Sequence, residues 1–98
     1  MVRHVILWQL KDGYSQEEAA KIKADIKEGL EGLKGKIDGI IDIKVHTKPL
    51  ASSNADLMLD SSFTDETALK TYATHPAHVA VADGKVRPFV KARVCMDF

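Results

Sequence analysis

Val2-Arg3-His4-Val5-Ile6-Leu7-Trp8-Gln9-Leu10 is the stretch of sequence that decides the fold. In a strand, His4, Ile6 and Trp8 share one face, and Val5 and Leu7 stand on the other. Both faces carry enough apolar side chains that each must be buried against another part of the protein or against a partner. One layer of helices covers only one face of a sheet, so the second face calls for another partner.

The segment from residue 15 to residue 34 is predicted to be an amphipathic helix. Ser15 and Glu18 have the spacing of a capping box, in which each side chain satisfies a backbone N–H of the other residue. Apolar residues then recur at helical spacing, including Ile22, Ile26 and Leu30.

Three further strands and a second helix follow. Alternating, β-branched or apolar runs predict strands at 40–48, 55–63 and 91–98. Thr64 or Asp65 is expected to cap the second helix, which ends before Pro76. A short turn or helix is expected at 77–89.

The order β-α-β-β-α-β predicts the α+β class and the ferredoxin-like fold, a four-stranded antiparallel sheet with the helices on one face. The bare sheet face, with Val5, Leu7 and Met58, would be an exposed apolar patch in a monomer. A homodimer that joins two sheets through these faces, forming a closed barrel, is therefore predicted.

Composition limits the function classes. The 98 residues fit one domain, 1–98, and 14 basic residues balance 14 acidic ones, so no nucleic-acid or anionic membrane partner is indicated. No apolar run reaches membrane-spanning length, and no signal-peptide pattern is present, which favours a cytoplasmic location. The single cysteine, Cys95, rules out an intramolecular disulfide and is interpreted as a small buried hydrophobe.

The second informative stretch is Thr71-Tyr-Ala-Thr-His-Pro-Ala-His78. Together with His4, with Val86-x-Pro88, and with the C-terminal Arg93-Val94-x-x-Asp97-Phe98, it resembles the stress-responsive α/β-barrel family of dimeric α+β barrel proteins. The resemblance covers the whole chain and implies the same dimer.

One branch of that family, the plant polyketide cyclases, closes a ring by intramolecular aldol condensation without a cofactor. The resemblance implies that Tyr72 and His78 match the residues that carry this chemistry, and that His4 matches a pocket histidine. The chain departs from the branch at two positions, because Leu57 stands where a pocket histidine is found and Ile26 where a pocket tyrosine is found.

These residues suggest a pocket between sheet and helices, and no cofactor is expected. The side chains predicted to line it are His4, Ile6, Trp8, Ile26, Leu57, Tyr72, His75 and His78. An imidazole such as His78 can exchange a proton near neutral pH, and a phenol such as Tyr72 can donate to a developing enolate oxygen.

Three functions stay open at this point. The first is a homodimer that binds a small apolar or carbonyl-bearing molecule. The second is a cofactor-free acid–base enzyme, cyclase or isomerase, that uses His78 and Tyr72. The third is a structural or interaction module in which His78 bonds a backbone carbonyl and the Tyr72 hydroxyl is tied to a loop.

Two smaller features of the sequence concern metal binding and ion pairing. His75 and His78 could share a metal ion with Asp83, but Pro76 disturbs their helical alignment, and no metal site is predicted. Asp97 is expected to pair with Arg93 or Arg3 across the strands.

Overall fold

The computed structural model describes all 98 residues and has the predicted order of elements. The elements are β1 (Val2–Leu10), α1 (Gln16–Glu31), β2 (Ile40–His46), β3 (Leu57–Phe63), α2 (Glu66–Thr74), α3 (Pro76–Val81), η1 (Ala82–Val86), η2 (Arg87–Phe89) and β4 (Val90–Asp97). The predicted strand and helix ends are displaced by no more than a few residues. The stretch at 77–89 is helical throughout, as α3, a π-helical turn and a 3₁₀ turn.

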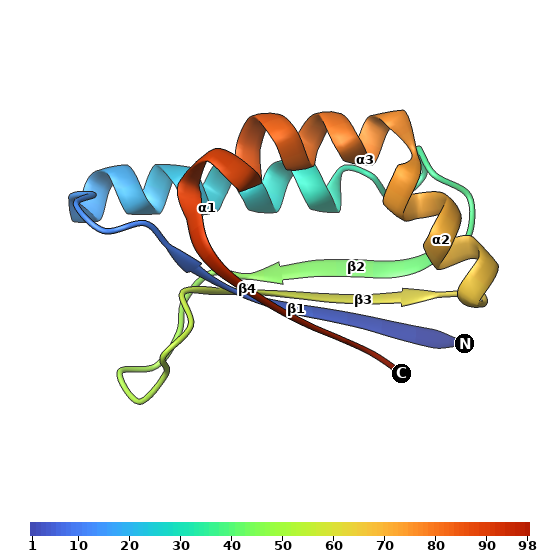
Figure 1. Ribbon diagram of the computed structural model, residues 1–98, viewed down its shortest axis with the longest axis horizontal. Coiled ribbons are helices and arrows are strands. Elements are labelled where there is room, and N and C mark those ends of the chain that lie inside the picture. Colours follow the sequence, from blue (N-terminus) through green and yellow to red (C-terminus); the bar gives the residue numbers. More distant parts are fainter.

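The sheet has the strand order β2-β3-β1-β4, with every pair antiparallel. All helices lie on one side of it, and the other side is free of helices (Figure 1). This is the predicted ferredoxin-like fold. No helix in the structure is long and apolar enough to cross a bilayer.

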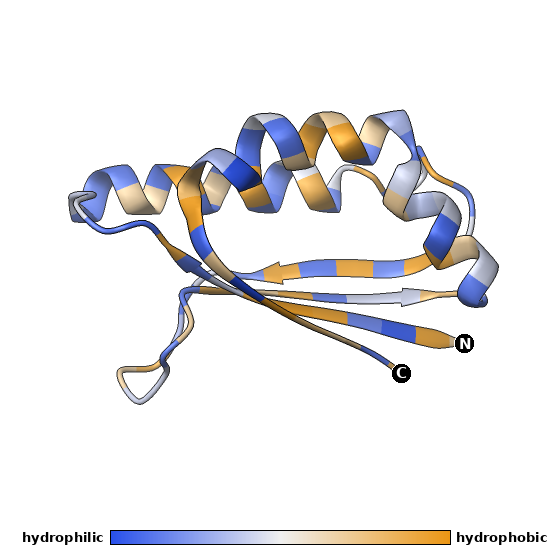
Figure 2. Ribbon diagram, in the orientation of Figure 1, coloured by the Kyte–Doolittle hydropathy of each residue, from blue (hydrophilic) through white to orange (hydrophobic).

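The helix-facing side of the sheet forms the core. Ile6, Trp8 and Leu10 of β1 are buried there, as predicted from the alternation of the strand. They belong to one cluster with Leu59 of β3 and Ile26 of α1. The alternation of apolar and polar residues is visible along β2 in Figure 2.

The predicted capping box begins α1, since Ser15 and Glu18 exchange their hydrogen bonds. At its other end, α1 is tied to the outer edge of β2. Glu31 Oε2 accepts from the Val45 N–H at 2.9 Å, and Lys27 Nζ donates to the Val45 carbonyl at 3.0 Å. These bonds satisfy backbone groups of an edge strand, and they hold α1 over the β2 half of the sheet.

The helix-free side of the sheet carries the apolar patch that the sequence predicts. The register places Val5 opposite Met96, and Leu7 between Met58 and Val94. Val94 and Met96 are 64% and 66% exposed in the single chain. An apolar patch of this kind on one sheet face is typical of an interaction surface.

Candidate functional site

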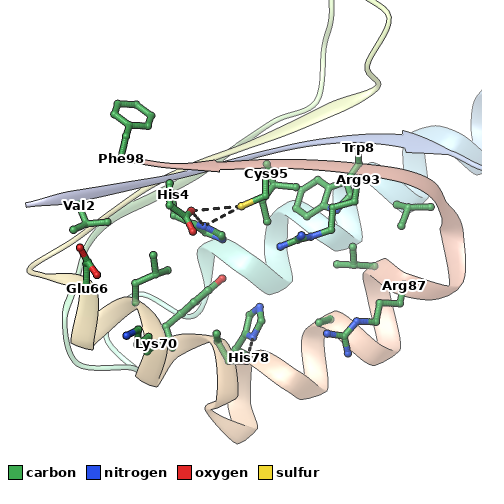
Figure 3. A pocket seen from close by; sticks show the side chains of 18 residues that line it. Val2, His4, Trp8, Glu66, Lys70, His78, Arg87, Arg93, Cys95 and Phe98 are labelled. Carbon is green, nitrogen blue, oxygen red and sulfur yellow. Dashed lines mark hydrogen bonds and ion pairs between the residues drawn. The ribbon is translucent and has the colours of Figure 1, made fainter.

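A cavity of about 820 Å³ lies between the β1–β4 half of the sheet and the helices α2 and α3 (Figure 3). Its apolar walls come from both layers and include Ile6, Trp8, Leu69, Val86 and Val90. Its polar lining consists of His4, Glu66, Lys70, Tyr72, His78, Arg87, Arg93, Cys95 and Asp97. The volume is within the range of ordinary small-molecule sites, and the mixture of apolar walls with a few convergent polar groups is typical of them.

Tyr72 of α2 is the most deeply buried polar side chain among those that line this cavity. It is only 1% exposed, yet its hydroxyl has no hydrogen-bond partner in the chain. The sequence alternative in which a loop holds this hydroxyl is therefore not the arrangement found in the structure. Burial raises the pKa of Tyr72 well above the ordinary phenol value, so the hydroxyl is a neutral donor across the physiological range.

His78 of α3 lies against Tyr72, with 4.3 Å between the two ring centroids. Its Nδ1 is 3.1 Å from the Ala73 carbonyl oxygen, as one of the sequence alternatives proposed. A carbonyl only accepts, so Nδ1 carries the proton and Nε2 is left as an acceptor. Burial lowers the pKa of His78, and the nearby charges of Arg87 and Arg93 act in the same direction, whereas the bond to Ala73 opposes them. The imidazole is therefore neutral at pH 7.

His4 of β1 is 8% exposed and is paired with Asp97, its direct neighbour on β4. The expectation that Asp97 pairs with Arg93 or Arg3 is wrong, because Arg3 points to the helix-free side and pairs with Asp60 there. Burial acts to raise the pKa of Asp97, but the hydrogen bond and charge of His4, assisted by the Cys95 thiol and the charge of Arg93, outweigh it and hold this pKa below its usual value. The carboxylate therefore fixes the proton of His4 on Nδ1.

The structure brings five of the predicted residues to the cavity and places three elsewhere. His4, Ile6, Trp8, Tyr72 and His78 line it. Ile26, Leu57 and His75 do not line the cavity.

Ile26 and Leu57 are fully packed core residues, because α1 covers the β2–β3 half of the sheet rather than the β4 half. His75 is held outside the cavity lining by the start of a new helix at Pro76. Its Nδ1 accepts from the Ala77 N–H at 3.1 Å and so caps α3. His75, His78 and Asp83 do not come close enough together to share a metal ion.

Sequence reasoning missed the contribution of β4 to the cavity. Arg93, Cys95 and Asp97 all line it, and Cys95 is an exposed residue rather than the buried hydrophobe that was predicted. Although the residue is exposed, the cavity wall partly shields its thiol from water, and this partial burial together with the neighbouring Asp97 carboxylate raises the pKa of Cys95. The sequence does contain a signal for this contribution. Every second residue from Arg93 to Asp97 is polar, and these residues lie on the face of β4 that meets the helices.

Comparison with known proteins gives consistent results. The profile of the family described as stress responsive A/B barrel domain matches residues 2–98. An uncharacterised protein of Streptomyces coelicolor is 32% identical over 84 residues, which are 82% of this chain and 81% of that protein.

Two solved structures have the same fold. A dimeric protein of unknown function from Bacteroides fragilis is 32% identical with a TM-score of 0.92, over 99% of this chain and 93% of that one. A dimeric ferredoxin-like protein from Thermobifida fusca is 20% identical with a TM-score of 0.78, over 99% of this chain and 88% of that one.

Replacing Tyr72 with Phe tests whether the hydroxyl is free. We expect Tyr72→Phe to leave the free energy of unfolding unchanged or to raise it by up to about 1 kcal/mol, because no bond to the chain is lost. Urea denaturation at one fixed protein concentration measures this, with Tyr14→Phe as the matched control. A loss of more than about 1 kcal/mol specific to Tyr72→Phe would show that the hydroxyl is bonded within the fold.

Proposed function

Because the chain belongs to the stress-responsive A/B barrel domain family, and because two proteins of the same fold are described as dimeric, we propose that it is a homodimer whose cavity binds a small apolar molecule bearing a carbonyl group. The observation that carries the binding proposal is the Tyr72 hydroxyl, buried and without a partner in a cavity of about 820 Å³. A buried donor left unpaired is costly, and a ligand that accepts from it removes that cost.

The rest of the lining supports a carbonyl-bearing ligand. Trp8 and Ile6 on the sheet side and Leu69 on the helix side offer apolar contact area. Tyr72 has a neutral donor, and His78 has a free acceptor nitrogen beside it. A carbonyl oxygen would accept from Tyr72 while the apolar part of the ligand packs against the walls.

The binding proposal is tested with benzoylacetone, an aromatic β-diketone, and with butylbenzene, which resembles it in shape but has no carbonyl. We expect benzoylacetone to raise the melting temperature and to bind at least about tenfold more tightly than butylbenzene, the equivalent of about 1.4 kcal/mol. Tyr72→Phe should remove most of this preference, and Tyr14→Phe should keep it. Equal binding of the two probes, or binding by neither, would contradict the proposal.

A second candidate function is proton abstraction next to a carbonyl group. The observation that favours it is the state of His78, a neutral imidazole whose Nε2 is free and whose ring packs on that of Tyr72. In this reaction, Nε2 takes a proton from the carbon next to the carbonyl, and the electron pair moves onto the carbonyl oxygen. The Tyr72 hydroxyl then donates to the resulting enolate.

The exchange of the methyl protons of acetophenone for deuterium measures this step. We expect His78→Gln to slow the exchange by about a hundredfold or more, while the exposed His46→Gln serves as control. Because the folded pKa of His78 is lowered, the rate should hold as pH falls through about 6.5 and decline only below it. Exchange that persists in His78→Gln would show that this residue is not the base.

The helix-free side of the sheet is the proposed dimer interface. Leu7, Val94 and Met96 are exposed there in a single chain, and no part of the same chain covers them. Burial of such a face between two sheets would remove apolar area from water, which is the main driving force for association.

A charge on this face should split the dimer. We expect the unmodified protein to sediment as a dimer at micromolar concentration and Val94→Asp to sediment as a monomer, because an unpaired carboxylate would be buried in the contact. The control is Ala80→Asp on the exposed side of α3. A monomeric unmodified protein, or a dimeric Val94→Asp variant, would contradict this interface.

A further inference from the structure

The side chains of His4 and Cys95 point toward each other on one wall of the cavity (Figure 3). Asp97, which is paired with His4, lines the same wall. His4 is the direct cross-strand neighbour of Asp97, and Cys95 stands two residues before Asp97 on the same face of β4. The Cys95 sulfur is 3.7 Å from His4 Nδ1 and 3.5 Å from Asp97 Oδ1. One nitrogen, one sulfur and one oxygen therefore lie within 4.8 Å of one another.

We propose that these three residues form a binding site for a divalent transition-metal ion of the zinc class. In a tetrahedral zinc site, bonds of about 2.3 Å to sulfur and about 2.0–2.1 Å to nitrogen and oxygen separate the ligand atoms by roughly 3.3–3.6 Å. Both distances from the Cys95 sulfur already approach this separation. The His4–Asp97 pair, which is hydrogen-bonded without the ion, separates to admit it.

The donor set selects the class of ion. Imidazole and thiolate favour zinc, cobalt and similar ions over magnesium or calcium, which prefer oxygen ligands alone. Cys95 binds as the thiolate and releases its proton to solvent. The proton that His4 carries on Nδ1 in the metal-free protein moves to Nε2, which leaves the Nδ1 lone pair to bind the ion. The two negative charges of Cys95 and Asp97 cancel the charge of the ion, so the guanidinium of Arg93, which lines the same wall, meets no net positive charge.

The Tyr72 hydroxyl provides an independent indication that a ligand occupies this end of the cavity. It is buried, it has no partner in the chain, and its ring centroid is 6.2 Å from that of His4. Three protein ligands leave the fourth position of a tetrahedral ion open, here toward the cavity. A water molecule or a carbonyl oxygen bound there would be in the space that Tyr72 lines.

The sequence predicts no metal site, and the residues proposed here are different from the set His75, His78 and Asp83 that it offered. The sequence hides it, because His4 and the Cys95-x-Asp97 pair are far apart in the chain and meet only through the β1–β4 register. It does not rest on the proposed binding of a carbonyl compound, since the metal alone is the probe.

Titration of the chelator-treated, full-length protein with Co²⁺ tests the site. We expect one ion per chain, visible d–d bands of a four-coordinate ion, and a near-ultraviolet thiolate-to-cobalt band. Cys95→Ser should abolish the thiolate band, and Asp97→Asn should weaken binding at least about tenfold. Because Cys95 is exposed, its substitution should leave the fold intact, which circular dichroism checks.

His46→Gln is the matched control, since His46 lies near a carboxylate but on β2, away from the cavity. It should bind Co²⁺ like the unmodified protein. Failure of the unmodified protein to bind, or binding that is unchanged in both Cys95→Ser and Asp97→Asn, would overturn the proposal. Neither result would bear on benzoylacetone binding, which is measured in the chelator-treated protein.

Discussion

The structure depends on the two-sided character of β1. This strand is central, between β3 and β4, and its alternation gives it one apolar set of side chains for each face. The helices bury the face of β1 that carries Ile6 and Trp8, and the face that carries Leu7 remains exposed to solvent. The same alternation therefore produces the core, the cavity wall and the exposed apolar surface that we propose as the dimer interface.

The cavity exists because the helix layer covers the sheet unevenly. The Val45 N–H donates to Glu31, and Lys27 donates to the Val45 carbonyl; these two hydrogen bonds hold α1 over β2. On β4, the residues that face the helices are Arg93, Cys95 and Asp97. Packing these polar side chains against apolar helix faces would remove them from water without a hydrogen-bonding partner, which is costly. The helices α2 and α3 stand over this polar strip and enclose a hollow rather than a second core.

Local sequence patterns were sufficient for the fold. The alternation of β1, the capping box at Ser15 and the helix end before Pro76 each depend on neighbours in the chain, and each was predicted correctly. The cavity depends on contacts between distant residues. Ile26 and Leu57 could not be assigned to the core half of the sheet without knowing where α1 lies. The partner of Asp97 could not be identified without the β1–β4 register.

The central claim is that the Tyr72 hydroxyl is an unsatisfied donor in a hollow site. A high-resolution crystal structure of the protein tests it most directly. We predict electron density for a water molecule or a small ligand about 2.7–2.8 Å from the Tyr72 hydroxyl oxygen, inside a cavity lined by Trp8 and His78. A cavity filled by the side chains of Trp8 and Arg93, with the hydroxyl bonded to an atom of the chain, would contradict the claim.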